Sequence, residues 1–151
     1  MNRTMILAAA ATLLTAPMAF ADSHAAAPSG DAEAGEAAFR QCIACHVVVD
    51  AEGETLAGRN ARTGPNLYRI SGRTAGTVED FRYSGSMVEA GEAGLVWDEE
   101  TFVAYVQDPT GFLREYLDDS GARGSMSFRV RSEEDAADLY AYLASLAPAE
   151  E

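Results

Sequence analysis

Hydrophobic positions recur with helical spacing in three parts of the chain. The clearest stripe lies near the C-terminal end, after a candidate N-cap at Ser132 with Asp135 in capping-box register. Its apolar residues, spaced at i, i+3, i+4 and i+7, are Ala136, Leu139, Tyr140, Leu143 and Leu146. This pattern predicts a helix that begins at Ser132, packs on one side and is followed by Pro148, which closes the domain.

Two further helices are predicted upstream. The first has Asp31 as its candidate N-cap, and its apolar face leads into Cys42. That face comprises Ala34, Ala37, Ala38 and Phe39. The second begins at Asp98, where acidic residues suit the positive end of the helix dipole, and Pro109 ends it. Its inward stripe comprises Phe102, Tyr105 and Val106.

Much of the remaining chain shows little periodicity. Short helices are predicted near Met87 and Phe112, whereas residues 47–71 contain several glycines and indicate a long loop region. The run Val47-Val48-Val49 has strand character, but no pairing partner is evident nearby. So much loop leaves a chain of 151 residues short of core unless a large apolar group lies at its centre. The pattern therefore predicts an all-α fold built around a prosthetic group.

The first 21 residues have the layout of a secretory signal peptide. Arg3 precedes an apolar run from Met5 to Ala16, and Ala19-Phe20-Ala21 forms a small-x-small cleavage site. The run is short for a bilayer span, so an uncleaved membrane anchor is the less favoured alternative. We expect cleavage after Ala21 and a periplasmic protein. The expected divisions are a signal peptide at 1–21, a flexible lead-in at 22–29, one domain at 30–147 and a tail at 148–151.

The charge balance excludes some partners. The chain has 24 Asp and Glu against 11 basic residues, all of them Arg, and a net charge of −13. Such acidity argues against nucleic acid or an anionic membrane as the main partner. The composition, 48% hydrophobic and 23% charged, is typical of a folded protein.

The two cysteines form the sequence Cys42-Ile43-Ala44-Cys45-His46, the C-x-x-C-H attachment motif of c-type haem. On a helical turn, residues three and four apart share a face, so both thiols and the imidazole point at one object. A thioredoxin-like pair would need a βαβ pattern, which is absent. A zinc site would need a fourth ligand, and His24 lies in the lead-in. The motif predicts one covalently attached haem c with His46 on the iron.

Two methionines remain as candidates for the other side of the iron once the signal peptide is removed. Met126 lies in the irregular, glycine-containing stretch 121–128, and a loop of this kind can aim a thioether at a metal. Met87 has a helical setting and is more readily explained as core. Met126 is therefore the favoured candidate for the second ligand, and Met87 stays the alternative.

The ordered motifs of the chain resemble those of the class I cytochromes c and, among them, the longer bacterial cytochrome c2 family. Besides CIACH, the resemblance rests on GDAEAGEAAF, TGPNLY, GRTAG, FRYSG, WDEETFVAYVQDP, GSMSF and DLYAYL, between about Gly30 and Leu146. It implies the class I cytochrome c fold, with three main helices, short ones and long loops around one covalently bound haem. Thioether bonds from Cys42 and Cys45 and axial ligation by His46 and Met126 follow by position.

The resemblance implies further roles. The Pro65 carbonyl would accept the His46 ring N–H, and Tyr105 would lie near Met126. The positions matching haem-propionate partners are Arg73, Tyr83 and Trp97. Phe39 and Tyr142 match the contact between the first and last helices. The position of Met87 often carries Asn in mitochondrial relatives.

A six-coordinate iron with His and Met ligands indicates a one-electron carrier and not an enzyme. The family implies a monomer that makes transient contacts with the cytochrome bc complex and with a photosynthetic reaction centre or terminal oxidase. Two alternatives stay open. The first is a haem enzyme or gas-binding protein with an open iron site. The second is an electron-transfer subunit of a periplasmic reductase or dehydrogenase.

The arginines gather in two segments without Asp or Glu, four within 55–73 and three within 122–131. Family members usually carry lysines around the exposed haem edge, where this chain has none. We expect a docking surface that steers the protein to acidic patches on redox partners. Its residues are Arg59, Arg62, Arg123, Arg129 and Arg131. Arg73 and Arg69 are expected to face inward to the propionates instead.

Overall fold

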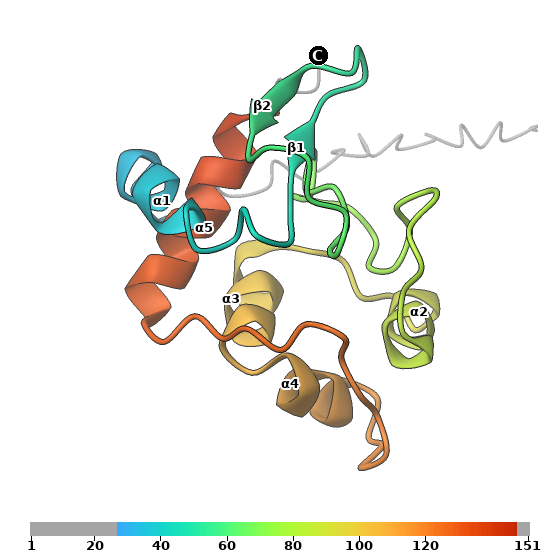
Figure 1. Ribbon diagram of the computed structural model, residues 1–151. Coiled ribbons are helices and arrows are strands. Elements are labelled where there is room, and N and C mark those ends of the chain that lie inside the picture. The colour runs from blue at the N-terminus through green and yellow to red at the C-terminus, as the bar shows by residue number, and fades with distance from the viewer. Residues whose placement is uncertain (1–26, 148–151) are drawn as a thin grey trace, which may run out of the picture.

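Five helices and a small sheet make up the part of the chain, residues 27–147, that the computed structural model describes (Figure 1). The elements are α1 (Ala32–Phe39), β1 (Val48–Val49), β2 (Thr55–Ala57), α2 (Gly85–Glu92), α3 (Glu99–Gln107), α4 (Pro109–Tyr116) and α5 (Glu133–Ser145). The mostly helical fold and its five helices agree with the prediction. The predicted signal peptide, His24 and the tail at 148–151 lie outside the described residues.

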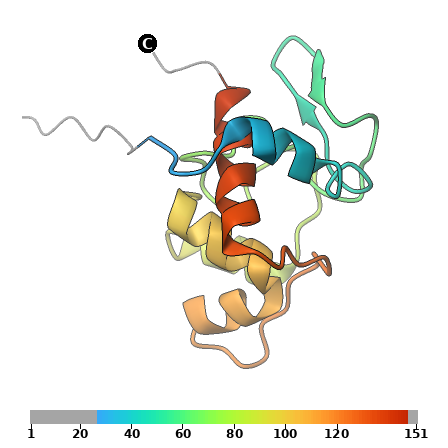
Figure 2. The ribbon, with the colours of Figure 1, turned by 90° about the vertical axis from the view of Figure 1, so that its left-hand side faces the viewer.

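Helix α1 crosses α5 (Figure 2), and the contact depends on a residue without a side chain. The Asp31 cap is confirmed, since its carboxylate accepts the N–H groups of Glu33 and Ala34 at 2.8 and 3.0 Å. A Cβ at Gly35 would overlap the Asp138 carbonyl of α5, so only glycine allows this approach.

The predicted buried face of α1 is partly wrong. Ala34 and Ala37 are exposed, whereas Gly35 and Phe39 are buried. The hydrophobic pattern predicted the wrong face because α5 packs against the backbone at Gly35. A glycine has no side chain, so it gives no hydrophobic signal at the buried position. The ring of Phe39 meets that of Tyr142 with centroids 5.6 Å apart, which is the predicted contact between the first and last helices.

The predicted helix boundaries near residue 98 and residue 132 are confirmed. Asp98 caps α3 and forms a capping box with Thr101. Asp108 follows α3 and caps α4, which has Pro109 in its first turn, where a missing N–H costs nothing. Ser132 caps α5 by accepting from the N–H of Asp135 at 3.2 Å.

The sheet corrects the prediction that Val48 and its neighbours lack a partner. Strand β1 pairs antiparallel with β2, with Val48 opposite Ala57 and an irregular register beside it. The turn between the strands is closed by Asp50, whose carboxylate accepts from the N–H groups of Glu52 and Glu54 at 3.0 and 2.7 Å. Strands of two and three residues are too short to show an alternating pattern, so the sequence hid them.

Loops supply one wall of the interior and helices the other. The loop wall is held together where the N–H of Gly72 donates to Trp97 at 2.8 Å and the N–H of Trp97 donates to Arg73 at 3.0 Å. None of the helices between residues 27 and 147 has the length and apolar character that a bilayer crossing requires. The space between the two walls is the candidate site.

Candidate functional site

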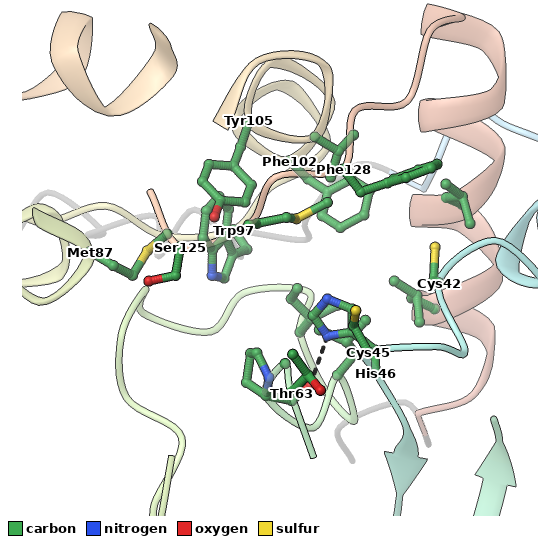
Figure 3. Close-up of a pocket in the computed structure, with 18 of the residues that line it drawn as sticks. Cys42, Cys45, His46, Thr63, Met87, Trp97, Phe102, Tyr105, Ser125 and Phe128 are labelled. Carbon is green, nitrogen blue, oxygen red and sulfur yellow. Dashed lines mark hydrogen bonds between the residues drawn. The ribbon is translucent and has the colours of Figure 1, made fainter. Parts of the chain in front are cut away.

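A largely apolar pocket lies between the helices and the loop wall (Figure 3). Helices α3 and α5 contribute to its lining, and so do the loops around residues 63–73 and 125–128. In Figure 3, Phe128 lies with Phe102 and Tyr105 of α3, across the pocket from Thr63 and His46. Its apolar lining includes Leu67, Ile70, Trp97, Phe102, Leu139 and Leu143. Such a lining holds a hydrophobic group and excludes water.

Two thiols and an imidazole enter this pocket from one helical turn. The N–H groups of Cys45 and His46 both donate to the carbonyl of Cys42, at 3.0 and 2.9 Å. Both cysteines are free thiols and both line the pocket. Burial, with a smaller effect of Cys45, raises the pKa of the Cys42 thiol to about 11, so this thiol is protonated at neutral pH.

The imidazole of His46 is fixed in one orientation. Its Nδ1 lies 3.0 Å from the carbonyl oxygen of Pro65, and because a carbonyl only accepts, Nδ1 carries the hydrogen. Burial lowers the pKa of His46, while the bond to Pro65 acts the other way. The neutral ring therefore keeps a lone pair on its second nitrogen, which faces the pocket in Figure 3. That nitrogen is free to bind a metal.

Both methionines of the described chain line the pocket. Met126 is half-buried in the irregular segment between α4 and α5. Met87, labelled in Figure 3, is buried, with 6% of its surface exposed. Tyr105 also faces the pocket, packs against Trp97 with ring centroids 5.0 Å apart, and has its pKa raised by burial to about 12. The Met126 thioether thus shares one apolar pocket with the His46 imidazole.

The residues matched to propionate partners lie together at the loop wall. Arg73 is half-buried and donates to the carbonyls of Tyr68 and Asn66 at 2.8 and 3.2 Å. Burial lowers the pKa of Arg73 and raises that of Tyr83, and the two groups partly offset these shifts for each other. Trp97 and both of these residues line the pocket.

Arg69 does not share this location. It is exposed, and its guanidinium carbon lies 5.7 Å from the ring centroid of Tyr68. This cation–π contact turns the charge toward the surface. The expectation that Arg69 faces inward is therefore wrong.

The five expected docking arginines are all exposed, but one of them has a partner. The guanidinium of Arg129 lies 2.8 Å from the carboxylate of Asp108. Sequence reasoning missed this pair. It also missed two side chains of α4, Arg114 and Thr110, which form hydrogen bonds with Ala122 and Gly124 near Met126. The Asp-Pro sequence at 108–109 could have predicted the N-cap of α4. No local sequence pattern indicates the contacts between α4 and the loop that carries Met126.

The donor set fits one kind of group. Two neighbouring thiols, an imidazole with one free nitrogen and a thioether around an apolar pocket fit a haem, which the thiols would attach covalently and the imidazole and thioether would hold at its iron. A metal ion alone would leave the large apolar lining without a function.

Comparison with known proteins supports this assignment. No family model matches the chain. Cytochrome c2 of Rhodovulum adriaticum is 70% identical over 123 residues, which cover 82% of this chain and 98% of that protein. The chain belongs to the cytochrome c2 family. The predicted family is thereby confirmed.

Other cytochromes of this class are similar to the chain over most of its length. Cytochrome c-551 of Roseobacter denitrificans is 50% identical over 97% of this chain and 96% of its own length. The X-ray structure of cytochrome c2 from Rhodobacter sphaeroides superposes with a TM-score of 0.76 at 59% identity, over 77% of this chain and 95% of that one. Cytochromes c2 are electron carriers with one covalently attached haem c. The predicted fold, cofactor and carrier function are confirmed.

Proposed function

We propose that this chain is a periplasmic one-electron carrier in which Cys42 and Cys45 hold the haem through thioether bonds. His46 and Met126 would hold the haem iron. The observation that carries the proposal is the neutral His46 imidazole, whose Nδ1 is held by Pro65 while its other nitrogen faces the pocket that Met126 also lines. The bound haem iron supplies the reversible one-electron step.

Each neighbouring residue has a defined task toward this group. Pro65 fixes the tautomer of His46 and raises its basicity as a ligand. Arg73 uses two of its five N–H donors on backbone carbonyls, which leaves donors and a positive charge for the propionates. Tyr83 and Trp97 are placed beside it to donate as well.

The pocket wall favours the reduced state. Phe102, Tyr105 and the other apolar residues exclude water, so the additional positive charge of the oxidised iron is poorly solvated. Ligation by His and Met acts in the same direction and raises the potential. Tyr105 lies near Met126 in this proposal, with its phenol kept neutral by burial.

If His46 and Met126 both held the iron, no site would be left for oxygen or peroxide, and the protein would act as a carrier and not as an enzyme. A haem enzyme with an open iron site would require Met126 to leave the pocket it lines. The proposed partners are the cytochrome bc complex as donor and a reaction centre or terminal oxidase as acceptor. A dedicated subunit role in a periplasmic reductase or dehydrogenase is the alternative for the partner.

The proposed docking surface consists of the exposed arginines Arg59, Arg62, Arg123, Arg129 and Arg131. Exposed charges speed the encounter with a partner of opposite charge. They also allow the partner to dissociate quickly, because they stay solvated and do not become part of a tight interface. Arg129 contributes less than the others since its charge is balanced by Asp108. A one-electron shuttle needs this kind of brief contact.

The experiment uses holoprotein matured in a host that makes c-type cytochromes. We expect one haem per chain, a reduced-minus-oxidised spectrum of a six-coordinate cytochrome, no carbon monoxide binding to the ferrous form, and rapid reduction by purified cytochrome bc complex. Ready carbon monoxide binding would contradict the carrier proposal and favour the open-site enzyme. Stoichiometric co-purification with a large reductase would favour the subunit alternative.

A further inference from the structure

The segment that carries Met126 has no regular secondary structure of its own. It spans residues 122–130, and within the described chain no N–H group of residues 125–129 donates to another residue. One contact comes from α2, where the Ser86 hydroxyl accepts from the N–H of Arg123 at 3.0 Å. A segment without a backbone ladder is positioned by groups of other elements. Those groups therefore decide how firmly Met126 is held.

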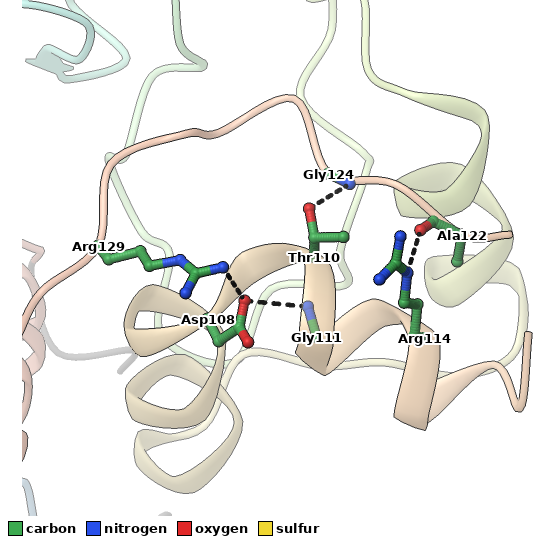
Figure 4. Close-up of polar contacts among 7 residues, drawn as sticks. All are labelled: Asp108, Thr110, Gly111, Arg114, Ala122, Gly124 and Arg129. Atoms are coloured by element: carbon green, nitrogen blue, oxygen red, sulfur yellow. Dashed lines mark hydrogen bonds and ion pairs between the residues drawn. The ribbon is translucent and has the colours of Figure 1, made fainter. Parts of the chain in front are cut away.

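Three of the remaining contacts come from α4 and its N-cap Asp108 (Figure 4), and α3 contributes one, in which the Val106 carbonyl accepts from the N–H of Val130 at 2.9 Å. Arg114 donates from Nε to the carbonyl oxygen of Ala122 at 3.1 Å. The hydroxyl of Thr110 accepts from the N–H of Gly124 at 3.4 Å. Both side chains are half-buried, so water competes with these bonds less than at an open surface.

Asp108 links the far end of the segment to the same helix. Its Oδ1 accepts from the N–H of Gly111, which caps α4, and lies 2.8 Å from Nη2 of Arg129. The two side chains are 60% and 49% exposed for Arg129 and Asp108, so this ion pair alone is weak. The contacts at Gly124 and Arg129, however, flank Met126 on both sides.

We infer that Asp108, Thr110 and Arg114 form a bracket that keeps Met126 in the pocket and sets how readily an external ligand reaches the iron. In the described structure none of the three lines the pocket, so they are positioning residues that act through Met126. This inference rests on the proposed axial role of Met126.

The bracket acts by setting the fraction of molecules in which the Met126 segment is released. An external ligand binds the iron only in molecules whose Met126 segment has been released, so its apparent affinity is proportional to that fraction. Loss of one bracket contact raises the released fraction, and the apparent affinity rises by the same factor. The covalent attachment and the His46 side of the pocket are unaffected.

The test measures cyanide binding to the ferric holoprotein. Thr110→Val removes the acceptor for Gly124 and keeps the branched shape. Asp108→Asn keeps an oxygen for the N–H of Gly111 and removes the charge that faces Arg129. We expect the cyanide affinity to rise about 2- to 10-fold for Thr110→Val and about 2- to 5-fold for Asp108→Asn. Thr110→Ser, which restores a hydroxyl, is expected to return it to the wild-type value.

Two matched variants lie outside the bracket: Glu115→Gln, an exposed carboxylate of the same helix, and Arg40→Gln, an exposed arginine. Both should leave the cyanide affinity unchanged. Denaturant unfolding is measured on all samples, because a purely structural role of Thr110 and Asp108 would lower the unfolding free energy and leave the cyanide affinity at the control value. That result overturns the bracket. A wild type without the near-infrared sulfur-to-iron band overturns the axial role of Met126 instead.

Discussion

Nδ1 of His46 lies 3.0 Å from the carbonyl oxygen of Pro65, 19 residues further along the chain. The ring reaches this carbonyl because Gly64, directly before Pro65, places no side chain in its path. A Cβ at Gly64 would lie 2.6 Å from Nδ1. One backbone carbonyl and one missing side chain thus orient the imidazole together.

The first prediction concerns this close approach. Gly64→Ala should displace the His46 ring, lower the yield of holoprotein and reduce the unfolding free energy by about 1–3 kcal/mol or more. The measurement is haem content together with denaturant unfolding. Gly85→Ala is the matched control, since a Cβ at Gly85 meets nothing within 4 Å and the residue lies in the first turn of α2. Equal behaviour of the two variants would show that the ring tolerates a side chain at Gly64.

The helix crossing gives a second prediction. Gly35→Ala would place a methyl group against the Asp138 carbonyl of α5 and separate the two helices. We expect a loss of about 1–3 kcal/mol of unfolding free energy, as overpacking usually costs. Ala34→Ser, on the exposed face of α1, should cost less than about 1 kcal/mol. A stable Gly35→Ala variant would contradict the backbone-to-backbone packing described here.

The docking surface predicts a salt-dependent effect. Arg123→Gln and Arg131→Gln should each slow the second-order reaction with the cytochrome bc complex severalfold at low salt. The difference should shrink at high salt, because ions screen exposed charges beyond about 10 Å at 0.1 M. Arg129→Gln should have a smaller effect than either, since Asp108 already balances that charge. Rates that respond neither to these variants nor to ionic strength would rule out steering by these residues.

Tyr105 gives a prediction for alkaline pH. Burial raises its pKa from 10.0 to about 12, so the folded protein keeps a proton that the unfolded chain releases at lower pH. Its contribution to stability is complete below pH 10 and is lost as the pH rises from about 10 to about 12. Tyr105→Phe should remove this part of the alkaline loss of stability. In a pH titration, the phenolate absorbance that the wild type shows and the variant lacks should appear near pH 12. Titration of that missing absorbance near pH 10 would contradict a buried phenol.

Local signals explain which parts of the fold the sequence predicts. The caps at Asp31, Asp98 and Ser132 involve residues two or three positions apart, so they can be recognised in the sequence, and all three are observed. The buried face of α1 could not be predicted, because Gly35 is buried for its lack of a side chain and a hydrophobic pattern does not detect such a position. The pairing of β1 with β2 was hidden because so few residues take part.

The same distinction applies to the site. The thiols and the imidazole at 42–46 are adjacent in sequence, and their convergence follows from helical spacing alone. The bond from His46 to Pro65 was expected from family resemblance and not from spacing. The contacts of Thr110 with Gly124 and of Asp108 with Arg129 depend on how a loop folds back over α4, and no local pattern marks them.

The ligand set is tested most directly by the near-infrared sulfur-to-iron band of the ferric holoprotein, recorded for the wild type, Met126→Ala and Met87→Leu. We expect the band in the wild type and in Met87→Leu, and its loss, with new carbon monoxide binding in the ferrous form, in Met126→Ala. A band that survives Met126→Ala and disappears in Met87→Leu would assign the thioether ligand to α2. A wild type without the band would contradict thioether ligation and, with it, the carrier mechanism.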